Sequence, residues 1–353
     1  MTRRALALSS SALLATIVGL ACTAKTADSD SGNPDSGTDV PDGDSGFDID
    51  GDSGTDSGTD GGGNGTCGAV IDATIRDFKG VNEAGGHPDF EFSGRGIYNP
   101  PPNQAELFKG WNDSGCGLVN AALVAGLPEF NATPVQIAGE QLAGYGAQRR
   151  VVSGPGCYSA TNTNPDPALD CNIGTCTAWT DFKPPSYTIQ SGASFNDWYH
   201  DTAYNKRLTA KIELVDDGTG TNTKLYDTTA FFPIDDQGWG NTPGVVGTDG
   251  KPHNFHFTTE IHVKFKYQTG QLFTFRGDDD LWIFVNGKLA LDVGGSHQAL
   301  LGTINFDAQA AALGIQPDQT YQMDIFHAER QTDASNFRIQ TNIQCIENVP
   351  PVN

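Results

Sequence analysis

The sequence predicts an all-β protein, built as an antiparallel β-sandwich or barrel with few short helices. Two observations carry this prediction. Residues 254–267, NFHFTTEIHVKFKY, alternate apolar and polar side chains over their whole length, which is typical of a strand with one face in the core and one face in water. Shorter strand-like runs are separated by turn residues, and the NGK of 286–288 is a strong hairpin signal between two of them.

Further stretches of the chain have the composition of strands, namely 210–217, 271–277, 281–287, 288–294, 321–329 and 336–343. Helix is scarce, and only NQAELFKGW (103–111) and DAQAAALGI (307–315) are credible as short helices. Such a succession of short strands and glycine-rich turns indicates packed sheets rather than alternating strands and helices.

The chain begins with the pattern of an export signal. Arg3 and Arg4 precede a short apolar run that ends at small residues and a cysteine, and this run is too short for a stable membrane span. Residues 19–22, GLAC, resemble the bacterial lipobox, which implies a signal peptide over residues 1–22 and lipidation of Cys22. Plain secretion is the alternative. We therefore predict an exported protein, either an outer-membrane-anchored lipoprotein or a cell-surface or extracellular protein.

Residues 23–66 predict a disordered linker. They contain eleven Asp, one Lys and almost no apolar side chains, so the segment cannot bury enough surface to fold and its charges repel each other. Of the total net charge of −22, −14 remains for residues 67–353, which we expect to form the globular domain. No basic stripe is available to neutralise phosphates, so nucleic acid is not expected as a partner.

The cysteines outside the export signal form an even set, which in an exported protein favours three disulfides: Cys67, Cys116, Cys157, Cys171, Cys176 and Cys345. The sequence leaves their connectivity open. Because Cys67 and Cys345 flank the whole domain, we expect them to tie its ends together. Residues 140–185 are rich in Cys, Pro and Asn, which predicts a disulfide-stapled surface insertion.

Several longer segments together resemble the fibro-slime family and occur in the order of that family over roughly residues 72–343. They are TIRDFKG…HPDFE, FNDWYHD, FFPIDDQGWG, HNFHFTTEIHVKFKY, FTFRGDDDLWIFVNGKLALDVGGSH and FHAERQTDASNFRI. The family is similar in turn to the anthrax protective-antigen-like domain, a jelly-roll-type β-sandwich shared by toxins, glycosidase accessory modules and yeast flocculins. The resemblance implies a carbohydrate-binding or adhesion module whose partner is a polysaccharide or a cell-surface glycan.

Three adjacent carboxylates, Asp278, Asp279 and Asp280, stand directly before the strand-like run 281–287. By resemblance to the sugar-binding members of the broader superfamily, Asp278 and Asp279 are joined by a cis peptide and hold a calcium ion, and sugar hydroxyls complete its coordination. The alternative is a solvated turn whose carboxylates face water. Asp280 is an additional carboxylate in this turn and a further candidate metal ligand. Asp292, at the end of a strand, either caps a turn or adds a further calcium ligand.

Other residues are candidates for contact with a glycan. Trp239, between glycines in QGWGN, would suit an exposed platform on which a sugar stacks. His297 follows a glycine pair in DVGGSHQ and either contacts the ligand or holds its loop. Arg330 and Asn336 lie in AERQTDASNF, where ligand contact and a structural ion pair of Arg330 with Glu329 are alternative roles.

The sequence does not predict a catalyst. His256, Glu260 and His262 share one strand face, but no fourth zinc ligand is placed by the sequence. No P-loop, nucleophile elbow or dinucleotide fingerprint occurs. Two other functions remain open: a slime or matrix protein that self-associates without binding sugar, and an enzyme acting on polysaccharide, which would need a carboxylate pair flanking a cleft.

Overall fold

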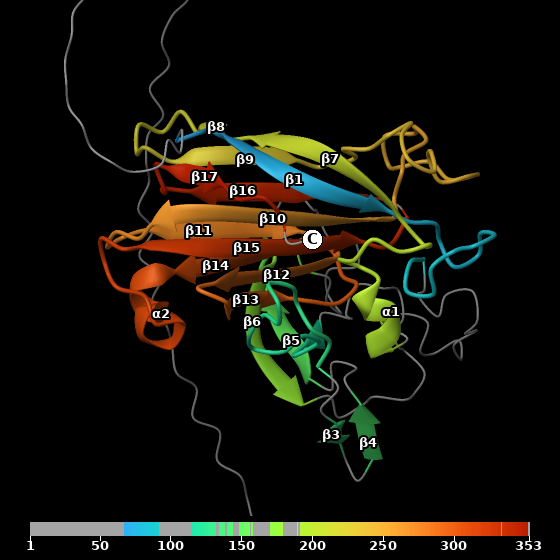
Figure 1. Ribbon diagram of the computed structural model, residues 1–353, viewed down its shortest axis with the longest axis horizontal. Helices are drawn as coiled ribbons and strands as arrows, with labels where there is room; N and C mark the ends of the chain where they lie inside the picture. Colours follow the sequence, from blue (N-terminus) through green and yellow to red (C-terminus); the bar gives the residue numbers. More distant parts are fainter. Residues whose placement is uncertain are drawn as a thin grey trace, which may run out of the picture. The chain divides into compact units, whose positions relative to one another are not determined.

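The computed structural model describes residues 67–91, 115–131, 134–137, 140–143, 148–155, 157, 170–178, 189, 191–332 and 334–351. Within these ranges the protein is an all-β sandwich of two sheets (Figure 1), which confirms the predicted fold class. The export signal with Cys22, the acidic linker and the expected helix over 103–111 lie outside the described residues.

Two sheets account for most of the described strands. Sheet A has the order β13 (Lys288–Val293), β12 (Asp280–Val285), β15 (Thr320–Glu329), β10 (Phe257–Lys266), β1 (Val70–Asp77) and β7 (Lys206–Glu213), and β17 (Ile346–Asn348) also pairs with β10. Sheet B has the order β2 (Gly115–Cys116), β5 (Gln148–Ser153), β6 (Asn172–Ala178), β14 (Leu300–Asn305), β11 (Leu272–Gly277), β16 (Phe337–Thr341), β9 (Lys224–Thr228) and β8 (Val215–Asp216).

The pairing is antiparallel throughout sheet A and almost throughout sheet B, where β14 and β6 run parallel. A separate hairpin joins β3 (Pro134–Ile137) to β4 (Glu140–Ala143). The turn between β12 and β13 is the predicted hairpin: Asn286 and Gly287 have φ angles of 53° and 72°, as the two central residues of a type I′ turn require.

Helix α2 (Phe306–Leu313) confirms the helix that was predicted over 307–315. The side chain of Asn305 accepts a hydrogen bond from the backbone N–H of Ala308, and Gly314 ends the helix in the left-handed conformation. Helix α1 (Gly192–Asn196) is a single turn capped by Ser191 and Ser194, and the sequence analysis did not anticipate it.

The core between the sheets is apolar. Phe257, Ile261, Val263 and Phe265 of β10 all point into it, so the apolar face of the long alternating segment lies where the sequence predicted. Each buried side chain of this size contributes about 1.5–3 kcal/mol relative to exposure.

Most of the polar face of the same strand is buried as well, which corrects the expectation that it lies in water; only Lys264 and Lys266 at its end are exposed as expected. The exposed fractions of His256, Thr258, Glu260 and His262 are 1%, 0%, 1% and 3%. A second apolar cluster covers this outer side of sheet A near β12 and β15, with aromatic side chains of the segment after residue 189 among its members. The hydroxyl of Thr258 accordingly donates to the backbone carbonyl of Trp198 (2.7 Å).

Two disulfides are described. Cys67 pairs with Cys345, as expected for the residues that flank the domain, and Cys157 pairs with Cys171. The side chains of Cys116 and Cys176 lie outside the described part, so the third disulfide stays a prediction. The segment 140–185 is more than a surface insertion, because β5 and β6 extend sheet B.

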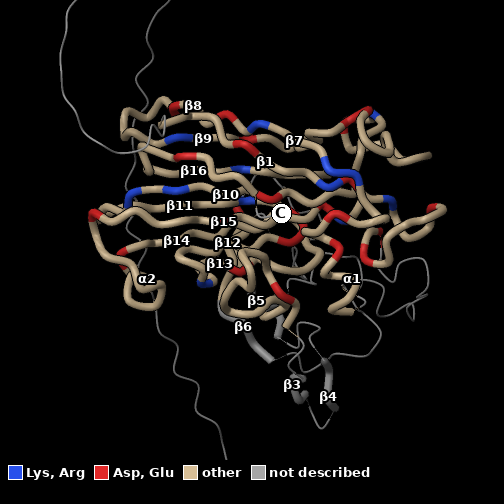
Figure 2. The backbone as a smooth tube through the Cα atoms, in the orientation of Figure 1, with Lys and Arg blue, Asp and Glu red and all other residues tan. Residues whose placement is uncertain are grey.

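Charged residues of both signs are interspersed along the described strands (Figure 2). None of the helices in the described ranges is long and apolar enough to cross a membrane.

Candidate functional site

Three connections between the two sheets meet at one end of the sandwich. Residues 278–279 lead from β11 in sheet B to β12 in sheet A, residues 294–299 lead from β13 to β14, and residues 330–336 lead from β15 to β16. The first connection is only two residues long and consists of Asp278 and Asp279. Hydrogen bonds join it to the other two connections, so the predicted Asp pair lies at the centre of this end.

Asp278 is bound to the connection 330–336. The backbone N–H of Asn336 donates to its Oδ1 (2.5 Å) and the Asn336 side-chain amide donates to its Oδ2 (2.7 Å). The backbone carbonyl of Asp278 lies 2.9 Å from Nε2 of His327, and burial lowers the pKa of this histidine to about 4, so its ring is neutral. The peptide bond between Asp278 and Asp279 is cis, as the family resemblance implied.

Asp279 is bound to both of the other connections. Its Oδ1 accepts hydrogen bonds from the hydroxyl of Ser296 and the backbone N–H of His297, both at 3.2 Å. Its Oδ2 accepts the backbone N–H of Arg330 (3.1 Å). The carboxylates of the pair therefore organise the loops around them, and they do not face bulk water as the solvated-turn alternative required.

Burial raises the pKa of both carboxyl groups. The pKa of Asp278 rises to about 6 even though the hydrogen bonds from Asn336 oppose the shift. The pKa of Asp279 rises to about 7, because burial and the neighbouring Asp280 and Asp278 outweigh the opposing charge of Arg330. The surroundings of the pair thus offset only part of the cost of burying two neighbouring carboxylates.

Two further oxygen atoms at this end, Oδ1 of Asn336 and Oε2 of Glu329, are buried without a hydrogen-bond partner among the described residues. Burial and the nearby Asp279 and Asp278 raise the pKa of Glu329 well above its usual range. Asn336 was predicted as a ligand-contacting residue, whereas Glu329 was expected only as a partner for Arg330. Its position as the last residue of β15, directly before the connection 330–336, was the available signal.

Asp280 has a different role from its two neighbours. Its Oδ2 accepts a hydrogen bond from Nε of Arg330 (2.6 Å) in a fully buried ion pair, and its Oδ1 accepts the backbone N–H of Gly295 (2.6 Å). Arg330 is itself 0% exposed and lies over the Trp198 ring at 5.0 Å. The structural partner of Arg330 is therefore Asp280 and not Glu329, whereas a metal-ligand role of Asp280 and a glycan contact of Arg330 stay predictions.

Asp292 and His297 are also engaged by the protein. Asp292 accepts hydrogen bonds from the backbone N–H groups of Gly117 (2.9 Å) and Gly294 (3.1 Å) and from the indole of Trp282 (3.1 Å). Of its two expected roles, the geometry favours capping the loop over coordinating calcium. Both ring nitrogens of His297 lie against backbone carbonyls, at 2.7 and 3.1 Å, so this side chain holds the loop and its backbone amide serves Asp279.

Trp239 is 40% exposed, as a stacking platform requires. Its backbone N–H donates to Asp77, the last residue of β1, which places it two strands away from Glu329 at the same end of sheet A. The ammonium groups of Lys206 and Lys79 lie 4.0 and 4.6 Å from the centre of its ring. A sugar that stacks on Trp239 would therefore displace at least one lysine.

The donor set around Asp278 and Asp279 fits a hard cation. Calcium takes six to eight oxygen ligands from carboxylates, amides, backbone carbonyls and water, and Asp278, Asp279 and Oδ1 of Asn336 are oxygen donors of this kind. Among the described residues, only Cys67, Cys345 and Glu347 bring three His, Cys, Asp or Glu ligand atoms within 4.8 Å, and these cysteines form a disulfide. Oxygens of another kind, such as the Asn336 amide, would therefore complete the set.

The zinc alternative on β10 is not supported by the geometry. His262 lies between Glu260 and Asp324, with both nitrogen–oxygen distances at 2.6 Å. His256 instead lies beside Glu91, 3.2 Å away. The nitrogens of His262 are thus taken up by carboxylates, and the histidines do not form one ligand cluster.

No protein-family model matches the chain. Similar sequences occur among proteins of Dictyostelium discoideum. Protein psiQ is 40% identical over 166 residues, which are 45% of this chain and 16% of psiQ. Protein psiI is 42% identical over 126 residues, which are 35% of this chain and 17% of psiI. The chain therefore spans less than a fifth of the length of these two relatives.

Among solved structures, the PA14 sugar-binding domain of an RTX adhesin aligns at 18% identity with a TM-score of 0.20, over 36% of this chain and 75% of that domain. The epithelial adhesin 6 A domain from Candida glabrata, in complex with Galb1-3GlcNAc, aligns at 17% identity with a TM-score of 0.21, over 45% of this chain and 70% of that domain. Overlaps of this size support no conclusion about function.

Proposed function

We propose that the chain is a carbohydrate-binding or adhesion module of the cell surface, in which calcium held by Asp278 and Asp279 helps to bind a glycan. The observation that carries the proposal is the buried pair of carboxylates beside the buried, unpartnered amide oxygen of Asn336. That the ligand is a glycan is inferred from the resemblance of the segments around this pair to the fibro-slime and protective-antigen-like families.

The physical argument rests on charge. A buried carboxylate is costly unless it is paired, coordinated to a metal or protonated. The cations that act on the pair have other partners: Arg330, beside Asp279, forms an ion pair with Asp280, and Arg276, beside Asp278, lies 3.8 Å from Asp170. A divalent cation would neutralise Asp278 and Asp279 together, and when bound it would offer further coordination positions to glycan hydroxyls.

A glycan array tests the proposal, with the purified protein applied in calcium buffer and in EDTA. We expect bound glycans in calcium and a loss of at least about tenfold in EDTA, which corresponds to about 1.4 kcal/mol of binding free energy. The Asp279→Asn variant should show the same loss in calcium. Asp318→Asn is the matched control, because Asp318 is exposed and distant from the pair in the topology.

Two outcomes would contradict separate parts of the proposal. If no glycan binds in calcium, carbohydrate binding is wrong and a self-associating matrix protein is the better hypothesis. If glycans bind equally in calcium and in EDTA, the module binds carbohydrate but calcium has no part in it.

A further inference from the structure

A cavity of about 590 Å³ opens on the outer side of sheet A, away from the residues that surround the Asp278–Asp279 pair. It lies over β1, β7 and β10, and its lining includes Thr74, Thr209, Glu260, His262, Val349 and Pro351. Its volume falls within the range of about 300–1,000 Å³ that is typical of small-molecule sites.

The cavity exists because β10 changes its partner. Glu260 is paired with Thr74 of β1, whereas Val263 is paired with Asn348 of β17. Asn348 is also fixed to β1, because its side chain donates to the carbonyl of Val70 (3.0 Å). Beyond it, the backbone N–H of Val349 donates to the carbonyl of His262 (2.9 Å). The chain after β17 is therefore held beside the cavity, where Val349 and Pro351 form an apolar part of its wall.

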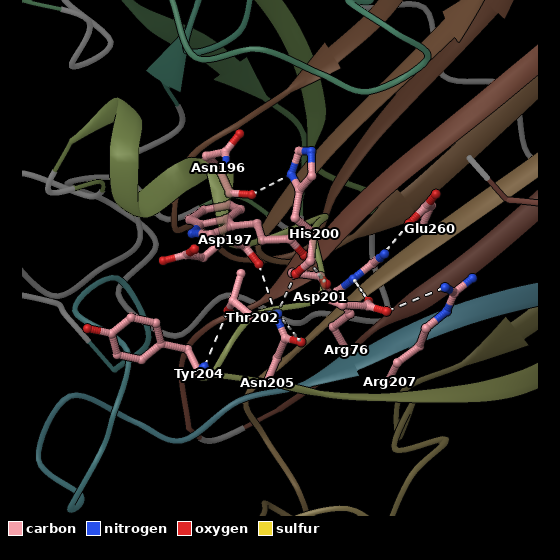
Figure 3. Close-up of polar contacts among 12 residues, drawn as sticks. Arg76, Asn196, Asp197, His200, Asp201, Thr202, Tyr204, Asn205, Arg207 and Glu260 are labelled. Carbon is pink, nitrogen blue, oxygen red and sulfur yellow. Dashed lines mark hydrogen bonds and ion pairs between the residues drawn. The ribbon is translucent and has the colours of Figure 1, made fainter. Parts of the chain in front are cut away.

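The floor of the cavity is a row of paired charges. His262 lies 2.6 Å from Glu260 and 2.6 Å from Asp324. Glu260 also pairs with Arg76, and Arg76 in turn pairs with Asp201 (3.1 Å). Figure 3 shows these contacts running from Glu260 through Arg76 to Asp201, and from Asp201 to Arg207 of β7.

These groups balance in charge. Burial alone would lower the pKa of His262, but its hydrogen bonds to Asp324 and Glu260 raise it to about 9, so the ring is an imidazolium at neutral pH. At the rim of the cavity, Arg207 pairs with Asp201 (3.5 Å) and Lys211 pairs with Asp72 (3.1 Å). Four cationic groups thus lie beside four carboxylates. The cations are Arg76, His262, Arg207 and Lys211, and the carboxylates are those of Asp72, Asp201, Glu260 and Asp324.

Hydroxyl groups lie in the middle of this charge-balanced surface. Thr74 is directly paired with Thr209 of β7 on one side and with Glu260 of β10 on the other. Neither threonine hydroxyl has a hydrogen-bond partner among the residues that the structure describes, although the Thr74 residue is only 6% exposed. A fixed array of donors and acceptors without net charge, beside an apolar wall, is suited to a neutral ligand that has many hydroxyls and one apolar face.

We propose that this cavity is a second binding site, which takes a neutral hexose unit of a glycan independently of calcium. Ligand hydroxyls would bind to the Thr74 and Thr209 hydroxyls and to the edge of Glu260, and a C–H face of the sugar would pack against Val349 and Pro351. An ionic ligand is disfavoured, because every described charge at the cavity already has an opposite charge within 3.5 Å.

Saturation-transfer NMR in EDTA tests the site, with methyl glycosides of glucose, galactose and mannose as probes and methyl glucuronide as the anionic comparison. We expect at least one neutral glycoside to bind and to bind more tightly than the glucuronide. The double variant Thr74→Val, Thr209→Val should weaken this binding about tenfold, because it removes two hydroxyls and keeps the β-branched shape. Thr320→Val, at an exposed position of β15, is the control.

The single variant Thr209→Val, on the edge strand, covers the case in which the double variant does not fold, and it should weaken binding about threefold. Asp279→Asn should leave the signal unchanged, which separates this site from the proposed calcium site. The proposal is overturned if no neutral glycoside binds in EDTA, if the glucuronide binds as well, if Thr→Val substitution has no effect, or if Asp279→Asn abolishes the signal.

Discussion

At the scale of single residues, three neighbouring aspartates have unlike surroundings. Asp278 and Asp279 receive hydrogen bonds from loops and have raised pKa values, while Asp280 forms a buried ion pair with Arg330. Substitution by Asn, which removes charge with little change of shape, should therefore have different consequences at the three positions.

Asp278→Asn and Asp279→Asn should each abolish the rise in melting temperature that calcium induces. If both carboxylates share one ion, the double variant should lose no more than either single variant, and this non-additivity identifies a shared site. Thermal unfolding in calcium and in EDTA provides the measurement, with Asp318→Asn as control. Should both single variants keep the full calcium response, the ion would have to bind elsewhere, and the connection 330–336 and Asp292 would be examined next.

Asp280→Asn should destabilise the protein by about 3–5 kcal/mol, because it leaves the guanidinium of Arg330 buried without its partner. The loss should be equal in calcium and in EDTA, as measured by urea unfolding. A loss that appears only in calcium would restore Asp280 to the ligand set.

His262 predicts a pH dependence of stability. Its pKa in the folded protein is about 9, above the usual value of 6.5, so the folded state keeps a proton that the unfolded state releases between these two pH values. The stabilisation, up to about 3 kcal/mol, is complete below pH 6.5 and is lost as the pH rises through about 9.

The His262→Gln variant isolates this contribution. It should be less stable than the unsubstituted protein at pH 6, and the difference should narrow as the pH approaches 10, as followed by denaturant unfolding at each pH. The exposed His200→Gln variant serves as control. A difference that stays constant with pH would show that the histidine is not held as an imidazolium.

The sequence identified the Asp pair because adjacent carboxylates before an apolar strand are unusual and resemble a known motif. It set Asp280 apart as an extra carboxylate, but it could not identify the partner of Asp280, since the ion pair with Arg330 joins positions fifty residues apart. His297 and Arg330 were expected at the site and do serve it, but through their backbone N–H groups. Backbone contacts of this kind leave no signature in residue type.

At the scale of strands and helices, the alternating pattern of 254–267 predicted β10 and its inward face correctly. It placed the outward face in water, because alternation reports only that one face is more apolar than the other. The layer that covers this face comes from a segment more than fifty residues earlier in the chain, around Trp198. Period-two patterns carry no information about such a distant layer, so the buried charges of β10 could not be anticipated.

The disulfide between Cys67 and Cys345 fixes the two ends of the domain next to each other. Its sequence separation is 278, against 14 for Cys157 and Cys171. In the chain-entropy account, a longer closed loop gives the larger stabilisation. The pair Cys67→Ala, Cys345→Ala should cost about 2–5 kcal/mol in urea unfolding, and more than Cys157→Ala, Cys171→Ala; the reverse order would contradict this account.

At the scale of the whole molecule, the excess of acidic residues is divided between the predicted linker and the globular domain. Residues 23–66, the predicted linker, hold eleven Asp and one Lys, and residues 67–353 carry the remaining net charge of −14. Self-repulsion extends a linker of this kind. A domain at the end of such a linker would be held away from a surface to which the other end is attached.

Lipidation of Cys22 would attach this predicted linker, and through it the domain, to a membrane. A single acyl chain holds a protein on a membrane only marginally, and stable anchoring needs a second one, which lipoprotein processing supplies. Mass spectrometry of the native protein should therefore find a mature N-terminus at Cys22 that carries acyl groups, and the protein should sediment with membranes. Cys22→Ser should release it. An unmodified N-terminus beyond residue 22 would show instead that the domain is secreted free of the membrane, with the linker as a tail.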